Sequence, residues 1–217
     1  MMSLALSRNP GRPKGVDSNC YATLLAVALS SFACHGFDGV SLRSIASSAG
    51  FNVSMVSHYF GSKAGLWRAV VDTMAQDHQD MLCEFLVLNK PDQPLASRLM
   101  RVLDTLVDRL AERPESIMFV TRELSAPGER LDYLIEKLIR PGAETYSLLW
   151  REAMEAGLFQ RADPVTFHIG LLGSLAMTLA FRPIFGQLGG REMSLEQLKD
   201  EMHTILNLTQ SASTPTR

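Results

Sequence analysis

Residues 52–60 combine small polar side chains with apolar ones at helical spacing. Val53 and Ser57 are four positions apart and share one helical face, whereas Val56 and Phe60 share another face that is apolar. Short side chains that hydrogen-bond or offer a methyl group suit the major groove of DNA, and an apolar inner face would hold such a helix in place. The pattern therefore predicts a helix that lies in the major groove.

Hydroxyl and basic side chains flank this stretch where phosphate groups are commonly bound. Ser41 and Lys63 each stand at the start of a predicted helix, where a side-chain donor adds to backbone N–H groups that attract phosphate. Arg43, one turn into its helix, can reach a phosphate or a base edge. Arg12 and Lys14 lie in an arm with Pro and Gly that resembles minor-groove arms, where arginine is favoured.

Helices are the elements expected to position these side chains. Apolar residues recur at spacings of three and four, and the alternation typical of strands is nearly absent, so the sequence predicts an all-α fold of about nine helices. Ser41 caps a short helix, Gly50 permits a sharp exit, and Asn52 caps the next helix, which outlines a helix-turn-helix. Further along, Ser194 and Gln197 form a capping box.

The predicted domain organisation has four parts. A flexible basic arm (1–15) precedes a helix-turn-helix domain (16–62), a helical regulatory and dimerisation domain (63–210) and a disordered tail (211–217). The net charge is −2, but residues 1–70 hold six Lys or Arg against two Asp, and the remainder holds 15 basic against 21 acidic residues. A basic head on an acidic body favours contact with nucleic acid at one end.

The composition is typical of a folded protein from a reducing compartment. With 46% hydrophobic residues the chain can bury a core, yet no run approaches the roughly 18 uninterrupted apolar residues of a membrane helix. The first fifteen residues lack the apolar core of a signal peptide. Cys20, Cys34 and Cys83 are odd in number and show no metal-ligand spacing. We therefore expect a cytoplasmic protein without metal, cofactor or membrane association.

Over residues 36–67 the sequence resembles the DNA-binding signature of the TetR family of transcriptional regulators. The shared positions are Gly36, Phe37, Ser41, Ile45, Ala46, Ala49, Gly50, Phe60, Ser62, Lys63 and Leu66. The resemblance implies an α-helical homodimer with a recognition helix over residues 52–58. It also implies a ligand-responsive repressor that releases a palindromic operator when a small-molecule effector binds.

The sequence departs from the common family pattern around the recognition helix. Ser57 stands where a Tyr often contacts phosphate and Tyr59 where His is typical, so we expect His58 and Tyr59 to take over phosphate contacts. Other departures are Phe51, Ser54, Ala64 and Gly65. The residues expected to bind DNA are Arg12, Lys14, Ser41, Arg43, Asn52, Val53, Ser54, Ser57, His58, Tyr59 and Lys63.

Two apolar helices near the C-terminus are candidates for a dimer interface. The segment from Pro164 to about Leu188 is apolar nearly all round, and Gly170 and Gly173 keep one side low enough for another helix to approach. The final helix offers a second stripe, formed by Leu195, Leu198, Met202 and Ile205. Together with the resemblance, these stripes predict a homodimer through the last two helices. Alternatively, both stripes complete the core of a monomer.

Polar or large residues in apolar surroundings are the candidates for an effector pocket, because pockets combine apolar lining with a few convergent polar groups. They are Met118, Phe119, Arg122, Glu123, Tyr146, Trp150, His168 and Met177.

Two other classes of function remain open at this stage. A small helical enzyme would need a catalytic set, for which His78 near Cys83, or His168, is a candidate, but no nucleophile-base-orienter set or phosphate-binding Gly loop is present. We therefore expect no enzymatic activity. A DNA-binding adaptor that responds to a protein partner would lack a cavity of ligand size.

Overall fold

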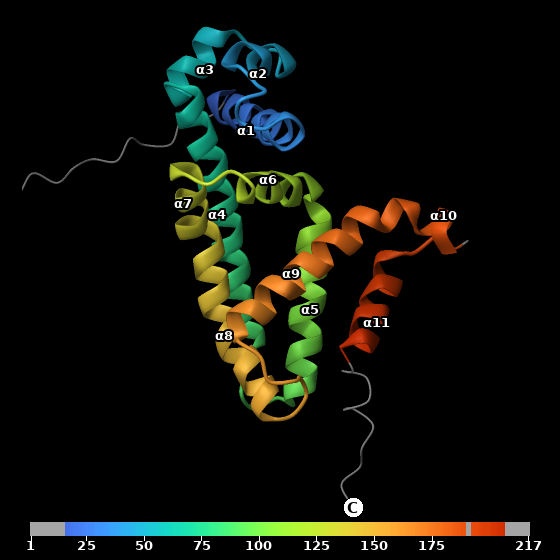
Figure 1. Cartoon of the computed structure of the whole chain (residues 1–217). Helices are drawn as coiled ribbons and strands as arrows, with labels where there is room; N and C mark the ends of the chain where they lie inside the picture. The colour runs from blue at the N-terminus through green and yellow to red at the C-terminus, as the bar shows by residue number, and fades with distance from the viewer. Residues whose placement is uncertain (1–15, 190–191, 207–217) are drawn as a thin grey trace, which may run out of the picture. The chain divides into compact units, whose positions relative to one another are not determined.

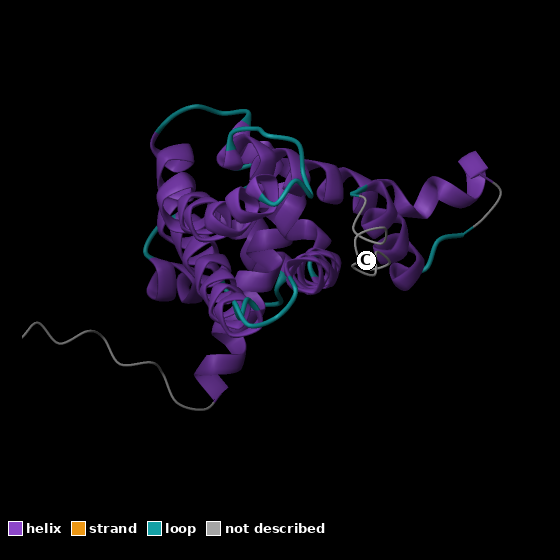
Figure 2. Cartoon of the chain, turned by 90° about the horizontal axis from the view of Figure 1, so that it is seen from below, coloured by secondary structure: helices purple, strands orange, loops and turns teal. Residues whose placement is uncertain are grey.

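The computed structural model describes residues 16–189 and 192–206 and contains only helices and loops within these ranges (Figures 1 and 2). The predicted all-α class is confirmed. The arm with Arg12 and Lys14 and the tail 211–217 lie outside the described residues. The chain divides into two compact units, Met1–Val70 and Val71–Arg217.

The first unit contains three helices and the start of a fourth, with bounds α1 Val16–His35, α2 Leu42–Ser48, α3 Val53–Phe60 and α4 Lys63–Leu88. Its core consists of fully buried apolar side chains, among them Leu24, Phe32, Ile45, Val56 and Trp67. Gly36 follows α1 with a φ of 74°, a conformation that suits glycine. Ser41 caps α2 through a capping box with Ser44.

The second unit holds the rest of α4 and the later helices: α5 Leu95–Glu112, α6 Pro114–Leu124, α7 Glu129–Leu134, the π-helical η1 Ile135–Ile139, α8 Arg140–Glu155, α9 Pro164–Phe181, the 3-10 turn η2 Arg182–Ile184, α10 Phe185–Gly189 and α11 Leu195–Ile205. Because α7, η1 and α8 are continuous, as are α9, η2 and α10, the described residues form nine helical segments. This number agrees with the prediction.

The helix that contains Pro141 and Gly142 is preceded by the π-helical turn η1. Pro141 has no N–H, and its ring would clash with the carbonyl of Lys137 in a regular α-helix. The N–H of Arg140 instead donates to the carbonyl of Ile135, five residues back. The wider turn accommodates the proline ring without ending the helix.

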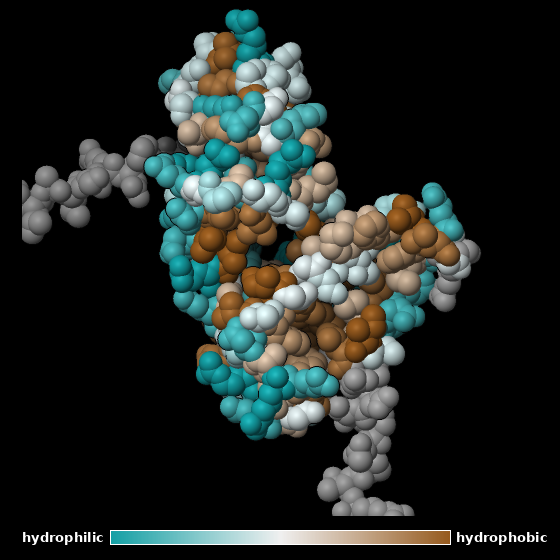
Figure 3. Space-filling view, in the orientation of Figure 1, coloured by the Kyte–Doolittle hydropathy of each residue, from teal (hydrophilic) through white to brown (hydrophobic). Residues whose placement is uncertain are grey.

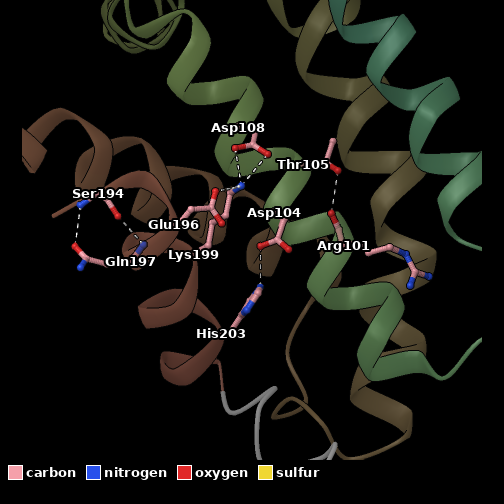
Figure 4. A network of polar contacts seen from close by, with 9 residues as sticks. All are labelled: Arg101, Asp104, Thr105, Asp108, Ser194, Glu196, Gln197, Lys199 and His203. Carbon is pink, nitrogen blue, oxygen red and sulfur yellow. Dashed lines mark hydrogen bonds and ion pairs between the residues drawn. The ribbon is translucent and has the colours of Figure 1, made fainter.

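The core of the second unit lies between α4, α5, α8, α9 and α11. Helix α11 packs on α5 through the buried side chains of Leu198 and Met202. Two ion pairs flank this contact: Lys199 with Asp108 at 2.8 Å, and His203 with Asp104 at 2.9 Å (Figure 4). Burial raises the pKa of Asp104, and His203 and then Lys199 oppose that rise. The position of α11 is therefore set by charge as well as by apolar packing.

Much of the continuous segment 164–189 is exposed although it is apolar. Its inner face contacts α5 and α8 and buries His168, Leu171 and Leu175. Outward-facing apolar side chains include Ile169 (47% exposed), Met177 (53%) and Phe181 (46%), and Figure 3 shows apolar residues gathered along α9 and α10. By length and composition alone this segment could cross a membrane.

Candidate DNA interface and interior polar cluster

Helix α3 has the two faces that the sequence predicts. Val56 is completely buried, whereas Val53 is 38% exposed. Ser54, Ser57 and His58 are also exposed. Met55 is exposed as well, and its Sδ accepts a hydrogen bond from the Cys20 thiol at 3.2 Å. The sequence interpretation did not include Met55, because a large apolar residue beside Val56 was not expected on the outer face.

The turn between α2 and α3 is built by backbone contacts. Gly50 adopts a φ of 75°, and the N–H of Phe51 donates to the carbonyl of Ala46 at 2.9 Å. Asn52 occupies the N-cap position of α3, but its side chain makes no capping hydrogen bond. The exposed amide of Asn52 thus stands at the start of the outer face.

Aromatic contacts tie the end of α3 to α1. Tyr21 stacks on Phe60 with ring centroids 5.0 Å apart and meets Tyr59 edge-on at 5.9 Å. Tyr59 is half-buried, whereas its neighbour His58 is exposed. Packing against α1 therefore fixes the ring of Tyr59 more firmly than that of His58.

The two expected phosphate anchors at helix starts both make contacts within the protein. The Lys63 ammonium donates to the carbonyls of Phe37 at 2.9 Å and Val40 at 3.1 Å, and it lies over the Phe37 ring. The Ser41 hydroxyl accepts from the N–H of Ser44. Lys63 thus joins the loop after α1 to the start of α4, a structural role that the sequence interpretation did not include.

Three of the eight pocket candidates meet inside the second unit. The indole N–H of Trp150 donates to Nδ1 of His168 at 3.2 Å. The Tyr146 ring stacks on His168 at 5.2 Å and on Trp150 at 6.0 Å. All three residues are at most 2% exposed, and Phe85 adds a further ring 4.5 Å from Tyr146. They form an aromatic cluster with one polar heterocycle inside it.

The structure brings His78 of α4 to the same place. A Cβ on Gly142 would lie 2.7 Å from Nε2 of His78 and 3.7 Å from Nε2 of His168, so both nitrogens face this glycine. The sequence interpretation considered His78 only as part of a catalytic alternative. No sequence signal pairs residues 90 positions apart in the chain.

The other five pocket candidates do not join this cluster. Phe119 is buried, and Glu123 is buried in an ion pair with Arg130 at 3.1 Å. Met118 and Met177 are half exposed. Arg122 is also exposed.

The described residues contain no group of three or more His, Cys, Asp or Glu side chains placed to hold a metal ion. Cys20, Cys34 and Cys83 form no disulfide with one another.

Comparison with known proteins connects the helix-turn-helix to a family. Residues 24–70 match the model of the bacterial regulatory proteins of the tetR family. The HTH-type transcriptional regulatory protein RaaS of Mycobacterium tuberculosis is 32% identical over 133 residues. This match spans 61% of the present chain and 58% of the length of RaaS.

Solved structures share the fold across most of the chain. A Clostridium perfringens protein described as a regulator of fatty acid metabolism has a TM-score of 0.70 at 22% identity, and the match covers 85% of this chain and 97% of that one. AibR, solved with isovaleryl coenzyme A and operator DNA, has a TM-score of 0.66 at 19% identity and covers 84% and 95% of the two chains.

The matching family and RaaS are regulators of transcription, which favours the interpretation of a regulator over that of an enzyme. Residues 24–70 of the chain therefore match the DNA-binding segment of the tetR family of bacterial regulatory proteins, and the chain as a whole shares its fold with solved regulators.

Proposed function

We propose that this protein is a cytoplasmic, ligand-responsive repressor that binds a palindromic operator as a homodimer. In each copy α3 lies in the major groove, and a small molecule bound in the second unit releases the DNA. The observation that carries this proposal is the division of α3 into a buried face at Val56 and an outer face of short polar side chains.

The outer face of α3 would read base edges. Val53 offers methyl groups for contact with thymine, and Ser54 and Ser57 can donate to or accept from either kind of base edge. His58, exposed beside the half-buried Tyr59, would contact phosphate. Arg43 is exposed on α2 and is free to reach the backbone or a base edge.

Further phosphate contacts would come from the arm and from the helix starts. Arg12 and Lys14 would enter the minor groove. Lys63 would contact phosphate through the donor that remains after its contacts inside the protein. The Ser41 hydroxyl donates to Ser44 Oγ in this structure and would turn from it to reach a phosphate. The ammonium of Lys63 has three donors, of which two are used by carbonyls.

The exposed apolar surface of α9 and α10 supports a dimer formed by a second copy of this chain. Gly170 and Gly173 have nothing within 4 Å of an added Cβ, so another helix can approach their backbone closely. Beside them a groove of about 430 Å³ is lined by Met177, Phe181 and Leu188, among other residues. Apolar area of this kind is costly in water, at about 25 cal/mol per Å². A two-fold interface also matches a palindromic operator.

The structural relatives support an effector that is a small organic molecule. One is described as a regulator of fatty acid metabolism, and AibR was solved with an acyl coenzyme A together with its operator. In this chain the aromatic cluster around His168 is the interior site that would respond to such a molecule.

Operator binding is tested by gel shift with the DNA upstream of the protein's own gene, measured at several salt concentrations. We expect affinity for this DNA to exceed that for scrambled DNA by at least a thousandfold. We also expect about a thousandfold loss of affinity between 50 and 200 mM salt if about six phosphates are contacted. Equal affinity for scrambled DNA contradicts the proposal.

Two variants distinguish contacts to base edges from contacts to phosphate. Ser54→Ala should change the preference among operator sequences, whereas Lys63→Ala should weaken binding to all of them alike. Ser48→Ala, an exposed serine at the end of α2, serves as the matched control.

Dimerisation is tested with Gly173→Leu, because a large side chain there would keep a partner helix away. We expect a monomer in sedimentation and loss of operator binding, while Gln79→Leu, at an exposed site on α4, remains dimeric. A wild-type protein that is monomeric in solution but binds phosphatidylcholine and phosphatidylglycerol vesicles would contradict the dimer and assign this surface to a membrane.

A further inference from the structure

His168 is a buried imidazole whose tautomer is set by its neighbour. It is 2% exposed, and its Nδ1 accepts the indole N–H of Trp150 at 3.2 Å. A neutral imidazole that accepts on Nδ1 carries its proton on Nε2. His168 therefore presents an Nε2–H donor toward Gly142, where a Cβ would lie 3.7 Å from this nitrogen.

His78 presents an unpaired nitrogen at the same point. Its Nε2 is enclosed and has no hydrogen-bond partner within the described part of the chain. Gly142 has no side chain to separate the two rings, and both nitrogens lie within 4 Å of its Cβ position. A buried polar atom without a partner is destabilising, so the unpartnered Nε2 of His78 beside the Nε2–H of His168 calls for an occupant.

Both imidazoles are neutral at neutral pH. Burial lowers the pKa of His78, and burial followed by the influence of His78 lowers the pKa of His168 to about 4. Tyr146, the other titratable group stacked against His168, stays protonated because burial, and then Glu84, raise its pKa. The cluster therefore offers hydrogen bonds without a fixed charge.

We propose that His78 and His168 form the head-group site of the effector, and that the effector is an apolar organic acid whose carboxyl group binds together with one proton. This inference rests on the proposed function and names the ligand class of its interior site. A protonated carboxyl group has one O–H donor and one carbonyl acceptor. His78 Nε2 can accept the first, and the Nε2–H of His168 can donate to the second.

The surroundings suit the rest of such a molecule. The rings of Phe85, Tyr146 and Trp150 provide an apolar lining on the α4 and α8 sides. The face of this unit is hollowed between α6 and α9, the helix that carries His168 (Figure 3). A bare carboxylate would be costly in this environment unless a proton neutralised it.

Binding of the acid takes up one proton from solvent. In solution at pH 7.5 the ligand is a carboxylate anion, and both histidines are neutral. In the complex the added proton lies between a carboxylate oxygen and Nε2 of His78, and no covalent bond forms or breaks. Affinity should therefore fall about tenfold for each pH unit above neutrality.

The site is placed to act on the DNA-binding unit because of the helix that carries His78. Helix α4 begins in the first unit and ends in the second. A carboxyl group that enters between His78 and His168 would separate α4 from α8 and α9. The resulting displacement of α4 would change the operator affinity.

The test is isothermal titration calorimetry of the full-length dimer with octanoate and with 3-phenylpropionate, in buffers of different ionisation enthalpy. We expect at least one acid to bind with uptake of about one proton per chain, and octan-1-ol and 3-phenylpropan-1-ol to bind at least tenfold more weakly. Binding of neither acid, or binding without proton uptake, overturns the inference.

Variants locate the site. His78→Gln keeps a polar amide but cannot be protonated, so it should abolish proton uptake and weaken acid binding at least tenfold. Gly142→Ala fills the space between the nitrogens and should have the same effect, whereas His35→Gln, an exposed histidine of α1, should bind as the parent does. Unchanged acid binding by both site variants contradicts the assignment.

The two proposals fail in different ways. Gel shifts with the same variants show whether operator binding persists. If the protein binds operator specifically but no acid binds at His78, the inference about the ligand is wrong and the proposed function stands. If specific operator binding is absent in the parent protein, the proposed function itself fails.

Discussion

Acid should destabilise the second unit through His168. The folded protein holds this imidazole neutral, with a pKa lowered from its ordinary 6.5 to about 4, mainly because it is buried. Between these values the unfolded chain binds a proton at this position and the folded chain does not. Unfolding therefore takes up protons, and the free energy of unfolding falls as the pH decreases from about 6.5 toward 4.

The size of this effect follows from the two pKa values. Each tenfold change in proton affinity is worth about 1.4 kcal/mol, so the complete contribution of His168 is about 3 kcal/mol. Between pH 8 and pH 5, about 2 kcal/mol of it should be lost. That is a large share of the 5 to 15 kcal/mol that stabilises a typical domain. His78, whose pKa is also lowered, acts in the same direction.

The assay is urea unfolding at pH 8, 7, 6 and 5 at one protein concentration, with the fluorescence of Trp150 as the signal. The chain has two tryptophans, so Trp67→Phe leaves Trp150 as the only reporter, located in the second unit. His168→Gln in this background keeps an acceptor for the Trp150 indole but does not titrate. Its stability should fall by about 2 kcal/mol less than that of the parent between pH 8 and pH 5. Parallel pH profiles for the two proteins would refute the reasoning.

Three further predictions concern the first unit, with Trp67 fluorescence in urea as the measurement. Lys63→Met should lower the free energy of unfolding of this unit by about 2 kcal/mol, because the carbonyls of Phe37 and Val40 lose a charged donor. Lys90→Met should have no effect. Equal stability of the two variants would show that the Lys63 contacts contribute nothing. Ser41→Ala should cost about 1 kcal/mol through loss of the α2 cap, with Ser48→Ala as the neutral comparison. Gly61→Ala should lower the free energy of unfolding by about 1 kcal/mol, because a φ of 72° is unfavourable for alanine. No neighbour lies within 4 Å of an added Cβ, so the backbone alone accounts for this loss. An unchanged urea midpoint would contradict the argument.

Local signals in the sequence predicted the helices well. Ser41 and Ser194 cap α2 and α11 through their side chains, as the sequence predicts. The two faces of α3 also agree with the spacing of its apolar residues. Such features depend on residues three or four positions apart, which the sequence displays directly.

Contacts between distant residues could not be predicted in the same way. Periodicity shows which face of a helix is buried, but not which other helix covers it. The chemistry of Tyr146, Trp150 and His168 makes them pocket candidates, and tertiary packing brings them together with His78. Met118 and Met177 are candidates on the same grounds, yet both are half exposed. The internal bonds of Lys63 likewise depend on a loop more than twenty residues earlier.

The uninterrupted course of α4 has a consequence for engineering. This helix runs from Lys63 to Leu88, so the boundary after Val70 falls inside a continuous helix. A residue inserted near Val71 would rotate everything beyond it by about 100° about the helix axis. Chimeras that graft the first unit onto another helical domain must therefore keep the helical phase, and insertions there should be made in multiples that restore whole turns.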